Sequence, residues 1–195
     1  LDRIFEESRQ PALCDAAVKL LMFLGKEGGK KLRKKKLETL FTAIAAAPSM
    51  VLDLLESPAF ARADTRSLFS IGIGGAATPP RVSALIAEKM PANFSGTGWG
   101  MTETNAAGAS LTGAAFSARP GSAGLPHPIV DIRICDEEGA ELAAGQTGEI
   151  QVRSPSNIRE YWRRPEANAK EFRDGWLKTG DIGFIDPEGF LYLAD

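Results

Sequence analysis

The chain has 195 residues, 44% of them hydrophobic and 25% charged, a balance typical of one globular domain or two small ones. Its formal net charge of -2 predicts no general affinity for nucleic acid or an anionic membrane. Two cysteines and one histidine are too few for a disulfide framework, a zinc site or a His-rich metal centre, so any bound metal would be a hard, oxygen-liking cation.

Targeting signals are not evident. The longest apolar run, AAVKLLMFLG, is short and is interrupted by Lys19, so it predicts a buried helix face and no membrane span. Cys14 and Cys135 lie far apart, which favours a reducing compartment such as the cytoplasm. The chain begins with Leu and ends in the strand-like stretch FLYLAD, which indicates a piece of a longer protein.

The first 36 residues remain unassigned. Residues 1–25 show helical spacing of apolar residues with a break at Pro11, and KEGGKKLRKKK follows as a basic run. We interpret 1–36 as a helical stretch with a basic linker, because such a run is usually a solvated helix end or linker. A patch that binds phosphate or nucleic acid is the alternative.

Residues 37–118 predict an α/β portion. Short apolar strands alternate with loops and amphipathic helices, an order typical of a mainly parallel sheet layer. The expected strands are LFTAIAAA (residues 40–47), Leu68–Ile73 and the strand-to-loop passage ANFSGTGWG, and the expected helices are Met50–Glu56 and RVSALIAEKM.

Residues 119–195 predict a second portion, a small antiparallel β-barrel or sandwich. Val130, Ile132 and Ile134 alternate with polar residues at period two. DEEG at 136–139 and DPEG at 186–189 are hairpin turn signals. The stretch EYWRRPEANAKEF predicts one helical interruption.

GIGGAATPP places paired glycines, Gly74 and Gly75, at the carboxyl end of an expected strand. Ligands of open α/β sheets lie at the carboxyl ends of the strands, and glycine lets a backbone approach a flat ligand closely. The alternative is a tight turn between strand and helix.

GTGWGMTET combines groups suited to a nucleotide. Thr102 and Thr104 offer hydroxyls for a phosphate, Glu103 is a carboxylate ligand for Mg²⁺, and Trp99 has faces on which a purine could stack. The alternative is a Thr-capped helix start with Trp99 in the core.

Asp181 follows Gly180 in the stretch KTGDIG. A carboxylate on a tight turn can accept hydrogen bonds from the vicinal hydroxyls of a ribose, although it can also satisfy only its own turn. Together with the Gly-Gly turn and the Thr-Glu loop, Asp181 indicates a nucleotide site. GxxxxGK[ST] occurs nowhere, so the site would lack a Walker-type loop.

At these residues the sequence resembles the adenylate-forming superfamily, which includes acyl-CoA synthetases, firefly-type luciferases and non-ribosomal peptide adenylation domains. GGAATPP is similar to its adenine-binding turn, GWGMTET to its Thr-Glu loop, and the stretch from GEIQVRSP through KTGD to its Thr-Gly-Asp region. The resemblance covers about residues 38–195, and Trp99 with RPGSAGLPHP is most similar to the fatty or medium-chain acyl-CoA synthetase branch.

The resemblance implies ATP- and Mg²⁺-dependent activation of a carboxylic acid to an acyl-adenylate, followed by transfer to coenzyme A. Thr102 and Glu103 would be the catalytic residues, Thr102 holding the α-phosphate and Glu103 ligating Mg²⁺. Gly100 and the residues just after Thr104 would border the acyl tunnel. The nucleotide would be bound by Gly74, Gly75, Ala76, Trp99, Gly100, Met101, Thr102 and Asp181, with the last on the ribose hydroxyls.

The chain also departs from this family. The phosphate loop that would precede residue 37 and the lysine of a following C-terminal domain, beyond a hinge, have no counterpart here, and Lys178 is not at the catalytic position. We therefore expect a central fragment that is inactive alone, and exposed sheet edges that favour a homodimer or aggregation.

Two other functions stay open. One is a non-catalytic homologue that acts as a binding module. The other is a different adenylating enzyme, either a peptide-synthetase adenylation domain or a luciferase type. The expected pocket stretch NAAGASLTGAA has no acid to hold an ammonium group, which favours an apolar acyl chain over an amino acid.

Overall fold

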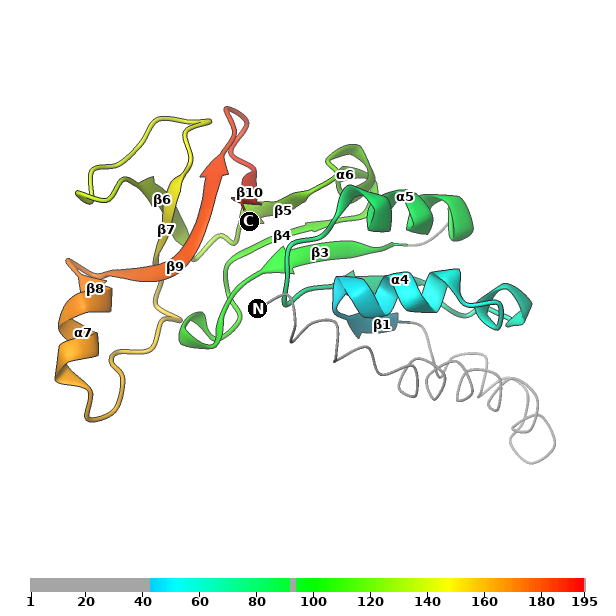
Figure 1. Ribbon diagram of the computed structural model, residues 1–195, viewed down its shortest axis with the longest axis horizontal. Helices are drawn as coiled ribbons and strands as arrows, with labels where there is room; N and C mark the ends of the chain where they lie inside the picture. The colour runs from blue at the N-terminus through cyan, green and yellow to red at the C-terminus, as the bar shows by residue number, and fades with distance from the viewer. Residues whose placement is uncertain (1–42, 92–93, 195) are drawn as a thin grey trace, which may run out of the picture.

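The computed structural model describes residues 43–91 and 94–194 (Figure 1). Its strands form one ten-stranded sheet in the order β1-β2-β3-β4-β5-β10-β9-β7-β6, with β8 paired to β9 beside this path. The strands are β1 (Ala43–Ala46), β2 (Ser70–Ile73), β3 (Gly96–Trp99), β4 (Ala109–Thr112), β5 (Ser122–Pro126), β6 (Asp131–Cys135), β7 (Gly148–Arg153), β8 (Phe172–Arg173), β9 (Trp176–Ile185) and β10 (Leu191–Ala194).

The first part of the sheet is the α/β portion expected from the sequence. β1 pairs with β2, and β2 with β3, in parallel, whereas β3 pairs with β4 antiparallel. Helices α4 (Pro48–Glu56), α5 (Pro80–Lys89) and α6 (Gly113–Ala118) follow the strands, together with the 3₁₀ turns η2 (Phe60–Arg62) and η3 (Thr102–Thr104). Proline at the start of α4 and of α5 fixes a φ that suits the first helical turn.

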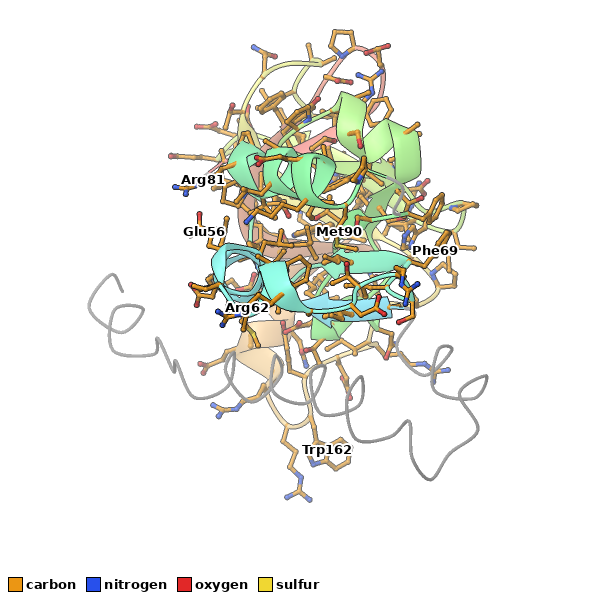
Figure 2. The ribbon with its side chains drawn as sticks, turned by 90° about the vertical axis from the view of Figure 1, so that its right-hand side faces the viewer. Glu56, Arg62, Phe69, Arg81, Met90 and Trp162 are labelled. Atoms are coloured by element: carbon orange, nitrogen blue, oxygen red, sulfur yellow. The ribbon has the colours of Figure 1, made fainter. Side chains whose placement is uncertain are left out.

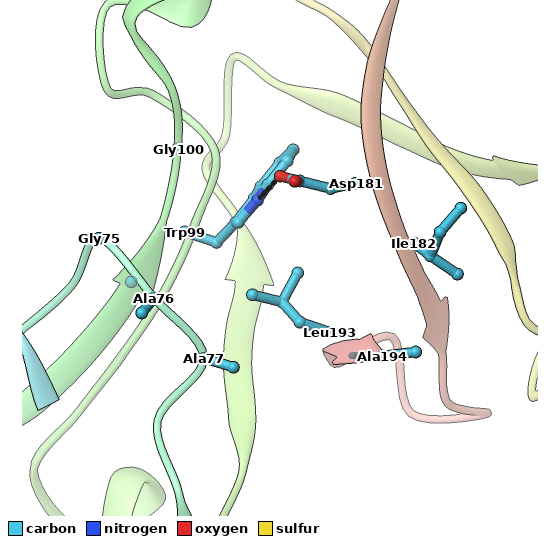
Figure 3. Close-up of a pocket in the computed structure, with 10 residues that line it drawn as sticks. Gly75, Ala76, Ala77, Trp99, Gly100, Asp181, Ile182, Leu193 and Ala194 are labelled. Atoms are coloured by element: carbon cyan, nitrogen blue, oxygen red, sulfur yellow. Dashed lines mark hydrogen bonds between the residues drawn. The ribbon is translucent and has the colours of Figure 1, made fainter. Parts of the chain in front are cut away.

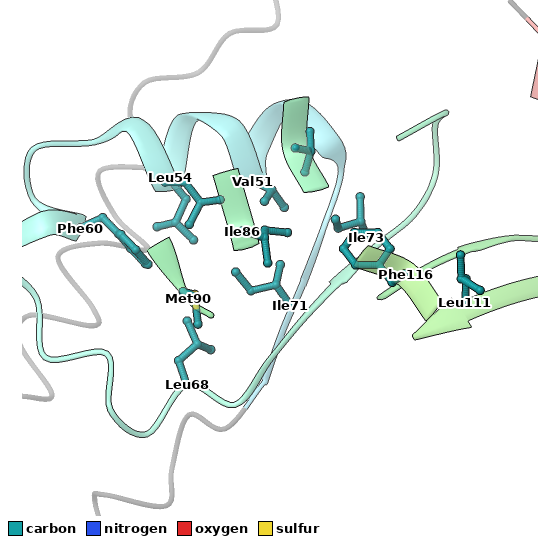
Figure 4. Packing of buried hydrophobic residues seen from close by; sticks show 12 residues of the cluster. Val51, Leu54, Phe60, Leu68, Ile71, Ile73, Ile86, Met90, Leu111 and Phe116 are labelled. Carbon is teal, nitrogen blue, oxygen red and sulfur yellow. The ribbon is translucent and has the colours of Figure 1, made fainter. Parts of the chain in front are cut away.

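These helices bury one face of β1–β4 in a first hydrophobic core (Figure 4). Val51 and Leu55 of α4 and Ile71 of β2 are completely buried there. Each side chain of this size contributes about 1.5–3 kcal/mol when removed from water. An ion pair between Arg81 and Glu56 joins α5 to α4 at the surface (Figure 2).

The second part of the sheet is antiparallel, as expected, but does not close into a barrel. β5, β10, β9, β7 and β6 pair in an open row, and no pairing joins β6 to β5 within residues 43–91 and 94–194. A second core fills its inner face, including Ala123, Ile150, Val152 and Leu191. Because β4 also pairs with β5, one sheet runs through both portions.

The predicted hairpins are present. Gly139 N donates to Asp136 O over 3.1 Å between β6 and β7, and Gly189 N donates to Asp186 O over 2.9 Å between β9 and β10. The expected helical interruption is α7 (Pro165–Glu171), which is shorter than the predicted stretch. Trp162 projects from the loop before it, with 78% of its surface exposed (Figure 2).

Gly124 of β5 lies where this strand passes from pairing with β4 to pairing with β10. Its φ of 106° is in the region that favours glycine. A Cβ at this position would fall well inside 3.0 Å of the Ser110 carbonyl group. The two parts of the sheet therefore meet at a point where a side chain cannot be accommodated.

The interpretation of residues 1–36 lies outside the described residues. The same holds for residues 40–42 of the first expected strand and for residues 92–93 of the expected passage ANFSGTGWG. The boundary between residues 37–118 and 119–195 stays a prediction. No helix within 43–91 and 94–194 is long and apolar enough to cross a membrane.

Candidate functional site

Four separate segments of the chain line a cavity of about 260 Å³ (Figure 3). They are the loop after β2, the end of β3, and the facing strands β9 and β10. Carboxyl ends of neighbouring parallel strands meet at one edge of a sheet, so the first two segments converge there. The lining residues are Gly75, Ala76, Ala77, Gly98, Trp99, Gly100, Asp181, Ile182, Leu193 and Ala194.

The two glycines of the Gly-Gly turn line different cavities. Gly75 has a φ of 81°, a backbone conformation that favours glycine. A Cβ there would meet no atom within 4 Å, so the need for glycine comes from the backbone and not from crowding. Gly75 and Ala76 line the cavity. Gly74 instead lines a second cavity, and its N–H donates to Ala46 O over 3.3 Å.

Trp99 and Asp181 are joined directly. The indole Nε1 donates a hydrogen bond to Asp181 Oδ2 over 2.7 Å, although 82 residues separate the two in the chain. The carboxylate is thus oriented by Trp99, and its own turn is closed by a different bond, from Asp181 N to Thr179 Oγ1 over 3.1 Å. Asp181 remains exposed at the cavity.

The free stacking faces expected for Trp99 are largely absent. The side chain is only 8% exposed and packs in the second core, beside residues such as Ala109 and Val130. Because side chains alternate along β3, Trp99 points toward that core. Trp99 therefore lies in the core, as the alternative interpretation expects, and it also forms part of the cavity wall.

The Thr-Glu loop is a single 3₁₀ turn, η3, and no α-helix starts there. Thr104 is completely buried, and its Oγ1 accepts from Met101 N over 3.2 Å and donates to Met101 O over 3.1 Å. The expectation that Thr104 offers a hydroxyl to a phosphate is therefore wrong, because the hydroxyl closes the turn. Thr102 is exposed, and the hydrogen bonds that close the turn are made by Thr104 and not by the Thr102 hydroxyl.

Glu103 lies on this turn, and Met101, Thr102 and Glu103 come directly after the cavity residue Gly100 without lining the cavity themselves. Tyr161 OH donates a hydrogen bond to Glu103 Oε1 over 3.1 Å. Burial and this hydrogen bond raise the pKa of Tyr161 above its usual value, so the hydroxyl keeps its proton at neutral pH and acts as the donor.

No motif in the sequence indicates a role for Tyr161. The two residues are 58 positions apart, and no local spacing connects them. Lys178, which the resemblance does not place at the catalytic position, forms an ion pair with Glu149 over 3.1 Å. This pairing is consistent with a structural role for that lysine.

A metal ion at this site would be coordinated jointly by the protein and by a bound nucleotide. Within residues 43–91 and 94–194, no group of three or more His, Cys, Asp or Glu side chains could hold a metal ion. Mg²⁺ that binds with a nucleotide commonly takes one or two protein carboxylates, with phosphate oxygens and water completing its shell. A single carboxylate such as that of Glu103 fits this arrangement.

A second cavity of about 600 Å³ lies against β1–β4. Ser70, Gly72 and Gly74 alternate along the chain with the core residues Ile71 and Ile73, so they face away from the helices. A Cβ at Gly72 or Gly74 would meet no atom closer than 3.7 Å. The lining is uncharged: Ala45, Ala46, Ser70, Gly72, Ile73, Gly74, Phe94, Gly96, Thr97, Gly98, Ser110 and Thr112.

Comparison with known proteins agrees with this geometry. The family of AMP-binding enzymes matches residues 32–162. This chain belongs to that family. The resemblance to adenylate-forming enzymes inferred from the motifs is thereby confirmed.

Curated relatives are CoA ligases that act on different acids. The chain is 39% identical over 158 residues to a long-chain-fatty-acid–CoA ligase of Bacillus subtilis, covering 79% of this chain and 27% of the relative. It is 32% identical over 154 residues to a feruloyl-CoA synthase of an Amycolatopsis species, covering 79% of this chain and 31% of that protein. The chain therefore spans about a third or less of the relatives that it matches.

Solved structures show the same fold. The amide bond synthetase McbA of Marinactinospora thermotolerans is similar with a TM-score of 0.71 and 39% identity, over 79% of this chain and 31% of that one. The O-succinylbenzoate coenzyme A synthetase of Bacillus subtilis, in complex with ATP and magnesium, is similar with a TM-score of 0.70 and 34% identity, over 83% of this chain and 32% of that one. The expected α/β fold of an adenylate-forming N-terminal domain is confirmed.

Proposed function

We propose that this AMP-binding chain forms part of the active site of an acid–thiol ligase. The enzyme would use ATP to convert a carboxylic acid, of fatty or medium chain length, to its acyl-adenylate and would transfer the acyl group to coenzyme A. The observation that supports this best is the cavity in which Gly75, Trp99 and Asp181, from three distant segments, come together.

The cavity can hold a nucleoside. Gly75 and Gly100 present backbone without side chains, so a flat base could approach their peptide groups. Asp181 Oδ2 is engaged by Trp99, and within the described residues no hydrogen bond or ion pair involves Oδ1. We assign Oδ1 to the ribose hydroxyls, with Ala76 beside the base and Trp99 fixing the orientation of the carboxylate.

The phosphates would lie over the η3 turn that follows Gly100. Thr102 would donate its exposed hydroxyl to the α-phosphate, and Glu103 would ligate Mg²⁺. Mg²⁺ supplies charge neutralisation at the phosphates when bound. Displacement at a phosphate depends on such neutralisation and on positioning more than on covalent chemistry from the protein.

The second cavity suits the acid. Its floor of Gly, Ala and Ser residues leaves room for a chain, and its lining contains no charged side chain. An amino acid substrate would need a carboxylate near its ammonium group, so the uncharged lining supports an apolar acyl chain. The sequence interpretation placed the acyl tunnel at Gly100 and just after Thr104, whereas this cavity lies along β1–β4.

A panel of acids tests the activity. Full-length protein should exchange labelled pyrophosphate into ATP in the presence of Mg²⁺ and a medium- or long-chain fatty acid, and it should form acyl-CoA when coenzyme A is added. Amino acids are the negative control and should not support exchange. Exchange that occurs only with amino acids would contradict the ligase assignment. If none of the acids tested supports exchange, the result would favour a non-catalytic homologue.

A variant at Gly72 tests the acid cavity. Gly72→Leu should lower exchange with long-chain acids by about tenfold or more, because the new side chain would fill the floor of the cavity, whereas short acids should be affected less. Gly72→Ala is the matched control, since its Cβ would make only ordinary contacts at 3.7 Å or more. Equal losses for long and short acids would show that Gly72 does not border the acyl chain.

A further inference from the structure

Tyr161 is the side chain that holds the candidate metal ligand. Its hydroxyl occupies one carboxylate oxygen of Glu103, Oε1, over 3.1 Å. No hydrogen bond or ion pair to the second oxygen, Oε2, occurs among residues 43–91 and 94–194. The carboxylate thus has one oxygen fixed by the protein and one that is open to a cation.

Tyr161 is itself fixed from α7. Its backbone N donates to Asn168 Oδ1 over 2.7 Å, and Asn168 Nδ2 donates to Tyr161 O over 3.1 Å. Its ring packs edge-on against Phe172, with 5.8 Å between the ring centroids. Both ends of the residue are therefore restrained, and the hydroxyl is presented to Glu103 in a defined position.

The backbone around Glu103 is secured separately. Ile158 N donates to Glu103 O over 2.7 Å, and Asn105 Nδ2 donates to Ser156 O over 2.7 Å. These bonds hold η3 against the segment 156–158 without using the Tyr161 hydroxyl. Loss of that hydroxyl should leave the turn in place and release only the Glu103 carboxylate.

We propose that Tyr161 is a positioning residue that orients the Glu103 carboxylate to ligate the divalent cation of the bound nucleotide. This inference rests on the metal role given to Glu103 in the proposed function. A glutamate side chain that is already restrained loses less rotamer freedom when it binds a metal. Hydrogen-bond partners behind a metal ligand typically alter metal affinity by about 10–100-fold when they are removed.

Metal binding is the decisive measurement. Full-length protein with ATP present should be titrated with Mn²⁺ and followed by electron paramagnetic resonance. Tyr161→Phe removes only the hydroxyl and should weaken Mn²⁺ binding by about tenfold. Tyr192→Phe is the matched control, because Tyr192 stacks on Phe184 in β9 and has no contact with Glu103. The control should bind Mn²⁺ as wild type does.

Two further results decide whether Tyr161 acts through Glu103. In a Glu103→Gln background, Tyr161→Phe should cause no additional loss of Mn²⁺ affinity, and a loss as large as in wild type would overturn the inference. An unchanged Mn²⁺ affinity in Tyr161→Phe would also overturn it, even if thermal stability or exchange fell, since that pattern indicates a purely structural residue. If Tyr161→Phe weakens Mn²⁺ binding but the wild-type protein activates no acid, the proposed ligase function is contradicted and this inference still stands.

Discussion

Replacing Glu103 with Gln should lower pyrophosphate exchange by the full-length protein by about a hundredfold or more. The amide keeps the size of the side chain and can still accept the hydrogen bond from Tyr161. It has no negative charge, however, and is a poor ligand for a hard cation such as Mg²⁺. Removal of one preorganised group that stabilises charge in a transition state typically costs about 10²–10³ in rate.

Exchange should be measured at several Mg²⁺ concentrations with a saturating acid. Glu188→Gln is a suitable control, because Glu188 forms a surface ion pair with Arg119 over 2.7 Å and lines neither cavity. The control should exchange within about twofold of wild type, as expected for an exposed ion pair. If Glu103→Gln exchanges as well as this control, the metal role of Glu103 is wrong.

Gly124→Ala should lower the free energy of unfolding by about 3 kcal/mol or more. Two costs add at this residue, namely a left-handed backbone that alanine adopts poorly and a methyl group forced against the Ser110 carbonyl. β5 cannot move away easily, since it pairs with β4 on one side and β10 on the other. Urea unfolding followed by tryptophan fluorescence would measure the change.

Gly139→Ala separates the two costs. Gly139 has a φ of 87°, but a Cβ there would meet no atom within 4 Å. Its substitution should therefore cost only about 1 kcal/mol, from the backbone conformation alone. Similar losses for both variants would indicate that the contact between β4 and β5 at Gly124 is looser than described.

The sequence was sufficient where local patterns determine structure. Alternating strands and helices predicted β1–β3 with α4 and α5, and the turns at Asp136–Gly139 and Asp186–Gly189 followed from residues that favour tight turns. It also predicted that Gly75, Trp99 and Asp181 act together, and the structure does place all three on one cavity. The nucleotide roles of these residues stay predictions.

Other features depend on contacts that no local pattern contains. The hydroxyl of Thr104 is used within its own turn, and Trp99 is turned into a core built by β5, β7 and β10. Tyr161 meets Glu103 only because the loop before α7 lies against η3, where Ile158 N also donates to Glu103 O. Antiparallel strands with hairpins did not reveal whether β5–β10 close into a barrel, because closure depends on strand tilt and stagger.

The position of β10 affects how the chain reaches its folded state. This strand is the last described element in the chain, yet it lies between β5 and β9, and β6, β7 and β9 reach β5 only through it. During synthesis, the edges of β5 and β9 that will pair with β10 remain unpaired until Leu191–Ala194 have been synthesised. Open edges of this kind invite pairing with other chains. Joining of the two parts into one sheet, and completion of the cavity wall at Leu193, are therefore late, coupled events that both depend on β10.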